Sequence, residues 1–195
     1  KYVRDAQFAT YVTKNFLQER YPTNAVSTNC SNVYLESVSE DILEDRLRKI
    51  SALQNHALVL GQAVASIDVR YKGEHLIIRA MSELKKKGIL LEYQIVGPGD
   101  GGFIKAQAQK YNVMNQVVFL GAKKKEEIFQ WLREIDVYAQ PSKQEGLPRS
   151  VIEAMSVGCP SIGSNIAGIP ELLDFECLFN PNSISDIVKS LEYIM

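Results

Sequence analysis

LLEYQIVGPGDGGFIKAQAQKYNVMNQVVFLG, residues 90–121, runs through a strand, a turn, a helix and a second strand. The apolar runs LLEYQIV (90–96) and VVFLG (117–121) are short, as is typical of buried strands. A glycine-rich turn, GPGDGG, separates the first run from FIKAQAQKYNV (103–113), which predicts a helix. Buried strands that alternate with helices indicate a parallel sheet.

The same alternation continues on both sides of this stretch. Further strands are predicted at 57–61, 136–142 and 160–164, and further helices at 73–88, 125–135, 149–158 and 184–195. The sequence therefore predicts the α/β class, with a Rossmann-like parallel sheet covered by helices on both faces. Such sheets bind ligands at the carboxyl ends of their strands, so the polar turns at 97–102, 119–125 and 141–148 should gather in one crevice.

Composition narrows the class of protein and its compartment. The chain has 195 residues, 46% of them hydrophobic, and a net charge of −1, which predicts no general attraction to nucleic acid or to an anionic membrane. No apolar run approaches the length of a membrane span. Cys30, Cys159 and Cys177 lack metal-ligand spacing and predict no disulfide framework, so we expect a reducing, cytoplasmic location.

The first part of the chain differs from the rest. Segments 9–23 and 41–50 have the spacing of amphipathic helices, and 24–37 between them is polar and loop-like. We expect residues 1–50 to be the tail of a preceding domain and a hinge, and residues 51–195 to be the Rossmann-like domain. The start at Lys1 and the uncapped helical pattern at the end predict a fragment whose C-terminal end is incomplete.

The turn QEGLPRSVIEAM (144–155) carries the polar groups of most interest. Pro148 suits the first position of a helix, and the free N–H groups of Arg149 and Ser150 would then form an anion site suited to phosphate. Glu145 and Glu153 flank this site, and each carboxylate can accept hydrogen bonds from neighbouring sugar hydroxyls. The alternative interpretation is two solvated surface glutamates.

The longer stretch 141–173, PSKQEGLPRSVIEAMSVGCPSIGSNIAGIPELL, resembles the glutamate–seven–glutamate region of group-1 (family-4-type) retaining glycosyltransferases of the two-Rossmann-domain (GT-B) fold. The segments RYKGEHLIIRAMSELKKKG (70–88), YQIVGPGDG (93–101) and 117–142 are similar to that family as well. The resemblance covers residues 57–180. It implies the C-terminal, donor-binding half of a GT-B enzyme, with a nucleotide sugar bound by residues 51–195.

The resemblance also implies roles for individual residues. Glu153 would bind the ribose hydroxyls of the donor, Glu145 the hydroxyls of the transferred sugar, and Lys72 the diphosphate, with Glu145 and Lys72 as the catalytic pair. Further donor-binding residues are Gly97, Gly99, Phe119, Leu120, Gly146, Leu147, Arg149 and Ser150.

One departure from the family concerns the phosphate end of the site. The family commonly has a basic residue after the glycine of the first strand, whereas Gly61 is followed here by Gln62. Arg70 could supply the lost charge and is included among the donor-binding residues.

The implied reaction is transfer of a hexose-type sugar from a nucleoside-diphosphate sugar to a glycan, lipid or small acceptor, with retention. No DxD motif occurs, so we expect no metal and no cofactor, with a cation and a helix dipole balancing the leaving charge.

The acceptor would bind a missing N-terminal domain, through which the enzyme could touch the inner face of a membrane. The isolated fragment is expected to bind nucleotide weakly and to be inactive. The alternative function is a non-catalytic, nucleotide-binding or scaffolding Rossmann domain.

Two other motifs have plainer interpretations. Gly97, Gly99 and Gly102 match the dinucleotide fingerprint, but the next strand ends FLGAKKK without the acidic residue that a ribose requires, so NAD binding is not favoured. The lysines at 85–87 suit a helix C-terminus, and those at 123–125 suit a solvated loop.

Overall fold

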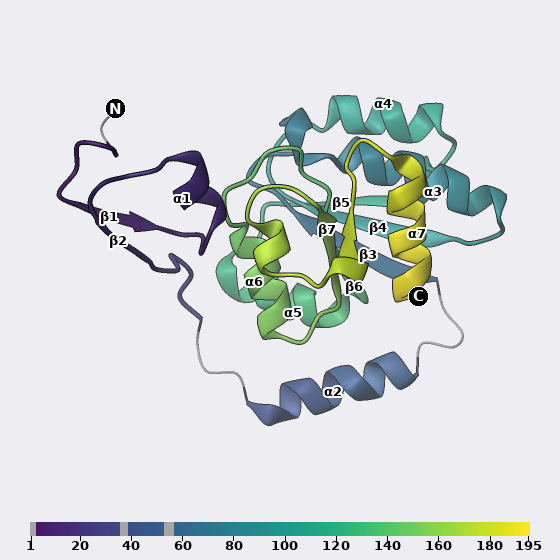
Figure 1. The fold of residues 1–195 in the computed structure, drawn as a ribbon. Coiled ribbons are helices and arrows are strands. Elements are labelled where there is room, and N and C mark those ends of the chain that lie inside the picture. The colour runs from purple at the N-terminus through teal and green to yellow at the C-terminus, as the bar shows by residue number, and fades with distance from the viewer. Residues whose placement is uncertain (1–2, 36–38, 53–56) are drawn as a thin grey trace.

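A computed structural model describes residues 3–35, 39–52 and 57–195 (Figure 1). The strands are β1 (Phe8–Tyr11), β2 (Val26–Asn29), β3 (Leu58–Ala63), β4 (Leu91–Val96), β5 (Val117–Gly121), β6 (Val137–Gln140), β7 (Ser161–Ser164) and β8 (Leu178–Phe179). The α-helices are α1 (Phe16–Arg20), α2 (Glu40–Ser51), α3 (Glu74–Lys86), α4 (Gly102–Lys110), α5 (Lys125–Glu134), α6 (Arg149–Ser156) and α7 (Ile184–Ile194). Short 3-10 helices are η2 (Arg70–Lys72), η3 (Met114–Gln116), η4 (Ile169–Glu171) and η5 (Phe175–Cys177).

The main sheet has six strands in the order β5-β4-β3-β6-β7-β8, and every neighbouring pair is parallel. The chain builds outward from β3 through β4 to β5, then returns to the other side of β3 with β6. The strand order therefore reverses between β3 and β6, which is where a doubly wound sheet leaves a crevice for a ligand. The predicted α/β class and Rossmann-like parallel sheet are confirmed.

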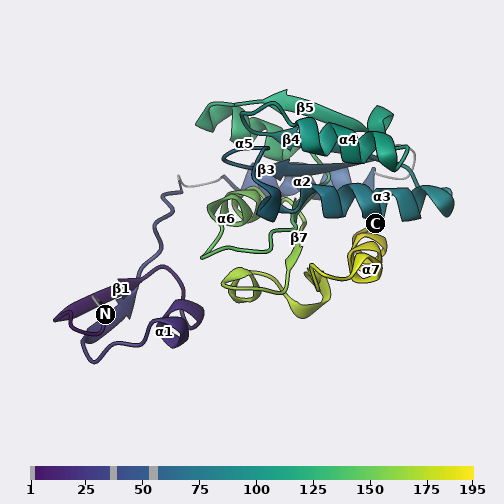
Figure 2. The ribbon, with the colours of Figure 1, turned by 90° about the horizontal axis from the view of Figure 1, so that it is seen from above.

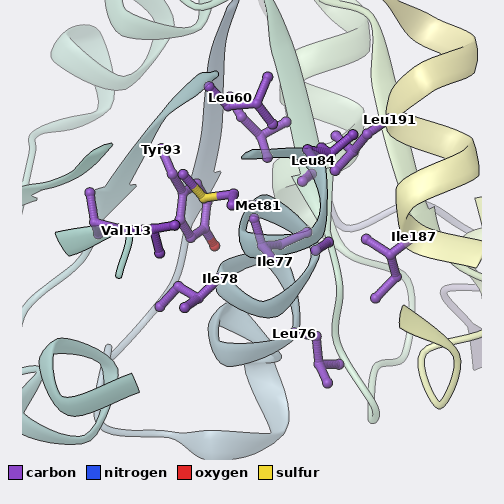
Figure 3. Packing of buried hydrophobic residues seen from close by; sticks show 14 of the residues in the cluster. Leu60, Leu76, Ile77, Ile78, Met81, Leu84, Tyr93, Val113, Ile187 and Leu191 are labelled. Atoms are coloured by element: carbon purple, nitrogen blue, oxygen red, sulfur yellow. The ribbon is translucent and has the colours of Figure 1, made fainter. Parts of the chain in front are cut away.

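Helices cover both faces of this sheet (Figure 2). On one face, residues of α3, α4 and α7 form a buried cluster with the sheet, in which Tyr93 of β4 and Met81 of α3 are almost fully enclosed (Figure 3). On the other face, Trp131 of α5 and Val151 of α6 pack with Tyr138 of β6. Because both faces of the sheet are buried, the strand sequences are largely apolar at consecutive positions.

Helix α2 is fastened to the sheet unit although it lies in the range predicted as tail and hinge. The buried guanidinium of Arg46 donates hydrogen bonds to the carbonyl oxygens of Leu132 (2.6 Å) and Ile135 (2.7 Å), at the C-terminus of α5. The ammonium of Lys49 lies 2.7 Å from the Asp136 carboxylate. A cation at a helix C-terminus satisfies carbonyl groups that lack helical partners. The boundary near residue 50 stays a prediction.

The segment before α2 corrects two expectations. The helix predicted over 9–23 is wrong: Phe8–Tyr11 form β1, and only Phe16–Arg20 are helical. The expected loop at 24–37 contains β2, which pairs in parallel with β1. Aromatic and β-branched residues favour extended backbone, and this preference outweighed the weak helical spacing.

Glu74, in the first turn of α3, is fully buried, and its carboxylate oxygens have no hydrogen-bond partner among the described residues. Burial raises the pKa of Glu74 from 4.5 to about 7, although its own backbone N–H and the charge of Lys72 oppose the shift. Ionisation at higher pH therefore places a charge in the interior that the backbone N–H and Lys72 compensate only in part.

We predict that Glu74→Gln becomes increasingly stabilising, relative to the wild type, as the pH rises through about 4.5 to 7. The raised folded-state pKa means that wild-type stability falls over this window, by up to about 3 kcal/mol, while the amide cannot ionise. Urea unfolding at pH 5 and pH 8 measures the difference. The control is Glu83→Gln, which removes an exposed ion pair with Lys86 on the same helix and should change little at either pH. An equal effect of Glu74→Gln at both pH values would contradict the prediction.

Candidate functional site

A cleft of about 690 Å³ opens at the carboxyl ends of the central strands, beside the point where the strand order reverses. Its walls come from the segments after β3, β4, β5 and β6, from the first turns of α5 and α6, and from the segment after β2. The predicted residues that line the cleft are Lys72, Gly97, Glu145, Leu147, Arg149, Ser150 and Glu153.

An ion pair joins the two sides of the strand reversal. The ammonium of Lys72, from the connection after β3, lies 2.7 Å from Oε1 of Glu145, from the turn after β6. The side chains are only 19% and 11% exposed, so water screens this pair weakly. The pair brings together the two residues that were predicted to be catalytic.

Gln140, the last residue of β6, fixes Glu145 through a hydrogen bond. Its side chain is 1% exposed, and Nε2 donates to Glu145 Oε1 at 2.9 Å and to Ser142 Oγ at 2.8 Å. Its Oε1 accepts hydrogen bonds from Ser150 Oγ at 3.1 Å and from the Tyr138 hydroxyl at 3.0 Å. Every hydrogen-bonding position of this amide is therefore in use, which fixes the orientation of Glu145. No sequence pattern indicated this role, because a single glutamine at the end of a strand has no distinctive spacing.

The N-terminus of α6 faces the cleft. Pro148 is the N-cap and the helix begins at Arg149, one residue later than the predicted arrangement with proline in the first helical position. The first N–H groups of the helix still lack helical acceptors, and the dipole adds partial positive charge. An anion in the cleft would meet this helix end and the Lys72 ammonium together.

Glu153 lies one turn further along α6, where it is partly buried and lines the same cleft. Burial raises the pKa of Glu153, while the charges of Arg149 and Lys125 oppose that shift. Glu145 and Glu153 are thus placed at two positions along one cavity, with the helix N-terminus between them in the sequence.

Gln62 occupies the position at which the family resemblance implied a basic residue. It is fully buried in β3, where its Nε2 donates to the carbonyl oxygen of Lys72 at 2.9 Å and its Oε1 accepts from the Tyr93 hydroxyl. Gln62 therefore holds the backbone of Lys72 and is not part of the cleft lining.

Gly73 brings the two halves of the site close together. It adopts φ +83°, a left-handed conformation, and a Cβ built at this position would lie 2.0 Å from the carbonyl oxygen of Pro141. A glycine is required there for both reasons. This contact sets Lys72, the residue before Gly73, against the end of β6.

A carboxylate binds the backbone N–H groups of the turn GPGDGG. The carboxylate of Asp68 accepts hydrogen bonds from the N–H groups of Asp100 (3.2 Å) and Gly101 (3.0 Å). A Cβ at Gly99 would lie 2.5 Å from that carboxylate. These amides, which a dinucleotide phosphate would use, already bind a negatively charged group, so the geometry also disfavours NAD binding.

Several predicted donor-binding residues lie outside the cleft lining, namely Arg70, Gly99, Phe119, Leu120 and Gly146. The Arg70 guanidinium stacks 4.5 Å from the centre of the Phe103 ring. Phe119 and Leu120 pack against the two hydrophobic clusters. The backbone of Gly146 supports the loop instead, since its carbonyl accepts from the Gly168 N–H at 2.9 Å.

Two groups of cleft residues were not predicted. Lys123 and Lys125, expected in a solvated loop, line the cleft opposite the turn after β6. Asn32, Val33 and Tyr34, from the segment read as a polar loop, line it too. The Lys125 ammonium lies 5.7 Å from the centre of the Tyr34 ring, at cation–π distance. Only tertiary structure could reveal these contributions, because they depend on where a distant segment returns.

Metal-binding clusters and membrane-spanning helices are both absent from the described residues. No group of three or more histidine, cysteine, aspartate or glutamate side chains in 3–35, 39–52 and 57–195 is arranged to hold a metal ion. None of the helices in these ranges is both long and apolar enough to cross a membrane.

Together, the doubly wound sheet and the polar cleft at its strand reversal define a Rossmann-like ligand-binding unit, one half of a GT-B architecture. Residues 54–195 match the family described as Glycosyl transferases group 1, and the chain belongs to this family. The chain is 31% identical to Protein CapJ of Staphylococcus aureus over 188 residues, which are 96% of this chain and 46% of that protein. It is 36% identical over 110 residues to the amylovoran biosynthesis glycosyltransferase AmsK of Erwinia amylovora, covering 53% of this chain and 27% of AmsK. The chain spans less than half the length of either relative.

Solved structures share the fold. A sucrose-phosphate synthase from Thermosynechococcus elongatus superposes with a TM-score of 0.77 at 18% identity, over 98% of this chain and 50% of that one. Anabaena HepE, solved in complex with UDP, gives a TM-score of 0.75 at 20% identity, over 96% of this chain and 54% of that one.

We predict that Gly73→Ala destabilises the chain by more than about 3 kcal/mol, because a left-handed alanine costs about 1–2 kcal/mol and the methyl group also meets the Pro141 carbonyl. Gly88→Ala is the matched control. Gly88 has nearly the same φ, +80°, but a Cβ there meets nothing within 4 Å. Urea unfolding should show the smaller strain cost alone for Gly88→Ala. Equal losses for the two variants would show that the close approach to Pro141 carries no energetic weight.

Proposed function

We propose that this chain is the donor-binding part of a retaining, metal-independent glycosyltransferase. It would bind a nucleoside-diphosphate sugar in the cleft, and the whole enzyme would transfer a hexose-type sugar to a glycan, lipid or small acceptor. The observation that carries the proposal is the Lys72–Glu145 pair at the strand reversal, beside the N-terminus of α6 and in the same cleft as Glu153.

The charges of the cleft suit a diphosphate linked to two sugars. Lys72 and the free N–H groups of α6 can bind the diphosphate, with Arg149 at the same helix end. Glu153 would accept hydrogen bonds from the ribose hydroxyls, and Glu145 from hydroxyls of the transferred sugar. Anabaena HepE, which shares this fold, has been solved in complex with UDP and glucose, and these are the two parts of such a donor.

The ion pair also suggests how the site responds to its ligand. Lys72 lies against Glu145 and balances its charge. An entering diphosphate offers Lys72 a second anionic partner, and Glu145, still held by Gln140, then has lone pairs for sugar hydroxyls. When the bond between sugar and phosphate breaks, the leaving diphosphate gains charge, which a fixed cation and fixed N–H groups stabilise. Such groups are typically each worth about 3–4 kcal/mol of barrier, so a metal ion is not required by the chemistry.

Our proposals for the acceptor and the cellular location are based on the relatives. CapJ and AmsK are about twice as long as this chain or longer, so we propose that an N-terminal domain completes the acceptor side. AmsK is named as a glycosyltransferase of amylovoran biosynthesis, and we propose that this chain likewise serves polysaccharide biosynthesis. We place the whole enzyme in the cytoplasm, with peripheral contact at the inner face of the membrane through that domain. This chain alone would bind nucleotide weakly and show little or no turnover.

We predict that Glu153→Ala weakens binding of the preferred nucleoside diphosphate about thirtyfold, since hydrogen bonds to a carboxylate contribute about 2 kcal/mol. Glu145→Ala should not weaken the nucleoside diphosphate, because Lys72 is then free to bind the phosphates, and should weaken only the complete nucleotide sugar. Titration calorimetry with UDP, GDP and ADP, and then with the matching nucleotide sugar, measures both effects.

Glu83→Ala, on the exposed side of α3, serves as the control and should bind like the wild type. The alternative function, a non-catalytic Rossmann scaffold, predicts the same affinities for all variants. That result would refute the donor-site assignment.

A pH titration gives an independent prediction. Because burial raises the pKa of Glu153, its carboxylate takes up a proton at higher pH than an ordinary glutamate does. Binding of a nucleotide sugar, whose diphosphate diester does not titrate in this range, should therefore begin to weaken as the pH falls toward mildly acidic values. Glu153→Gln should bind more weakly at neutral pH and show a flatter profile. Parallel profiles for the two proteins would contradict the role of Glu153.

A further inference from the structure

A second hollow, of about 560 Å³, lies on the other side of Glu145 from the cleft. One wall is the face of α1 and the residue after it, with Phe16, Arg20 and Tyr21. The opposite wall is the turn after β6, with Lys143 and Glu145. Glu145 is thus shared between the proposed donor cleft and this hollow.

The two walls are fastened to each other. The Glu171 carboxylate of η4 accepts hydrogen bonds from the backbone N–H groups of Lys14, Asn15 (3.0 Å) and Phe16 (2.8 Å) at the start of α1. Burial alone would raise the pKa of Glu171, but these donors outweigh burial and the pKa ends below its usual value. The carboxylate therefore stays ionised and keeps α1 against the sheet unit at neutral pH.

A close backbone contact reinforces this attachment. A Cβ at Gly168 would lie 2.6 Å from the Gly146 carbonyl oxygen and 2.9 Å from the Thr13 side chain. Gly168 therefore lets the loop of the donor cleft and the segment before α1 meet closely, so the hollow has a defined shape.

The hollow has an excess of positive charge. Arg20 and Lys143 are exposed, and neither forms an ion pair within residues 3–35, 39–52 and 57–195. The lining holds one acid, Glu145, so its two cations outnumber the carboxylates even when a bound diphosphate takes Lys72 from Glu145. A neighbouring hollow that shares Arg20 and Tyr21 adds one cation, Arg4, and one acid, Asp5, and so does not offset this excess.

The same wall offers aromatic surface. The Arg20 guanidinium lies 5.7 Å from the centre of the Tyr21 ring and donates to its hydroxyl at 3.2 Å. Phe16 contributes a second ring to the lining. Flat aromatic faces beside cations suit a sugar ring that carries a negatively charged group.

Resting on the proposed donor site, we infer that this hollow binds the acceptor and selects an acceptor sugar bearing a carboxylate or phosphate group. The sugar ring packs against Phe16 and Tyr21, and its anionic group meets Arg20 and Lys143. A hydroxyl of that sugar then lies next to Glu145, where the transferred sugar of the donor is held. Arg20 and Lys143 are specificity residues in this arrangement and take no part in the donor cleft.

Amide chemical shifts test the inference on this chain, because they report where each ligand binds. The probes are methyl glucuronide and glucose 1-phosphate, and neutral methyl glucoside serves for comparison. Each sugar is added to protein whose donor cleft is saturated with a nucleoside diphosphate. If no nucleoside diphosphate binds the cleft, the sugars are added without nucleotide. We expect the charged sugars to shift the amides of Leu17, Ile166 and Ala167 and to bind at least about fivefold more tightly than the neutral one. The preferred charged probe distinguishes a uronate-bearing glycan from a phosphate-linked acceptor.

Lys143→Gln and Arg20→Gln should each remove most of this preference, whereas Lys189→Gln, which changes an exposed charge on α7, should retain it. Added salt should weaken the charged sugars and leave the neutral one unchanged. Equal binding of charged and neutral sugars, or shifts confined to the donor cleft, would overturn the inference. Failure of every nucleotide to shift Arg149 and Ser150 would instead refute the donor site, so the two failures are distinguishable.

Discussion

The site depends on one close approach, where the connection after β3 meets the end of β6. Gly73 passes so near Pro141 that a side chain does not fit, and this contact sets the Lys72 ammonium 2.7 Å from Glu145. Parallel strands on either side of a reversal send their connections in opposite directions, which opens a cleft between them. The ion pair spans that opening, so the contact at the centre of the proposed donor site is also a direct consequence of the topology.

Buried amides keep this pair in place. Gln140 uses all of its hydrogen-bonding positions on Glu145, Ser142, Ser150 and Tyr138, and Gln62 holds the backbone of Lys72. Neither glutamine carries charge, so they orient the charged groups without competing for an anionic ligand. A preorganised site of this kind needs little rearrangement when charge develops on a leaving group.

The sequence was sufficient for the sheet, since buried parallel strands and amphipathic helices have distinct apolar periods. The roles of Lys72, Glu145 and Glu153 came from the family resemblance and stay predictions, although the structure does bring all three residues into one cleft. The sequence was insufficient for residues 9–23, where β1 replaces the first part of the predicted helix, and for Tyr34 and Lys125, which reach the cleft only through tertiary folding. The role of Gln140 was not predicted for a related reason. It depends on hydrogen-bond partners that a single sequence does not show.

We propose that a nucleoside diphosphate binds in the cleft by taking the Lys72 ammonium from Glu145. A crystal structure of the complex with the bound nucleoside diphosphate tests it most directly. We predict that the diphosphate lies at the N-terminus of α6, that the Lys72 ammonium contacts a phosphate oxygen, and that Glu153 binds the ribose. A ligand at the GPGDGG turn, or an intact Lys72–Glu145 pair with the nucleotide elsewhere, would contradict it.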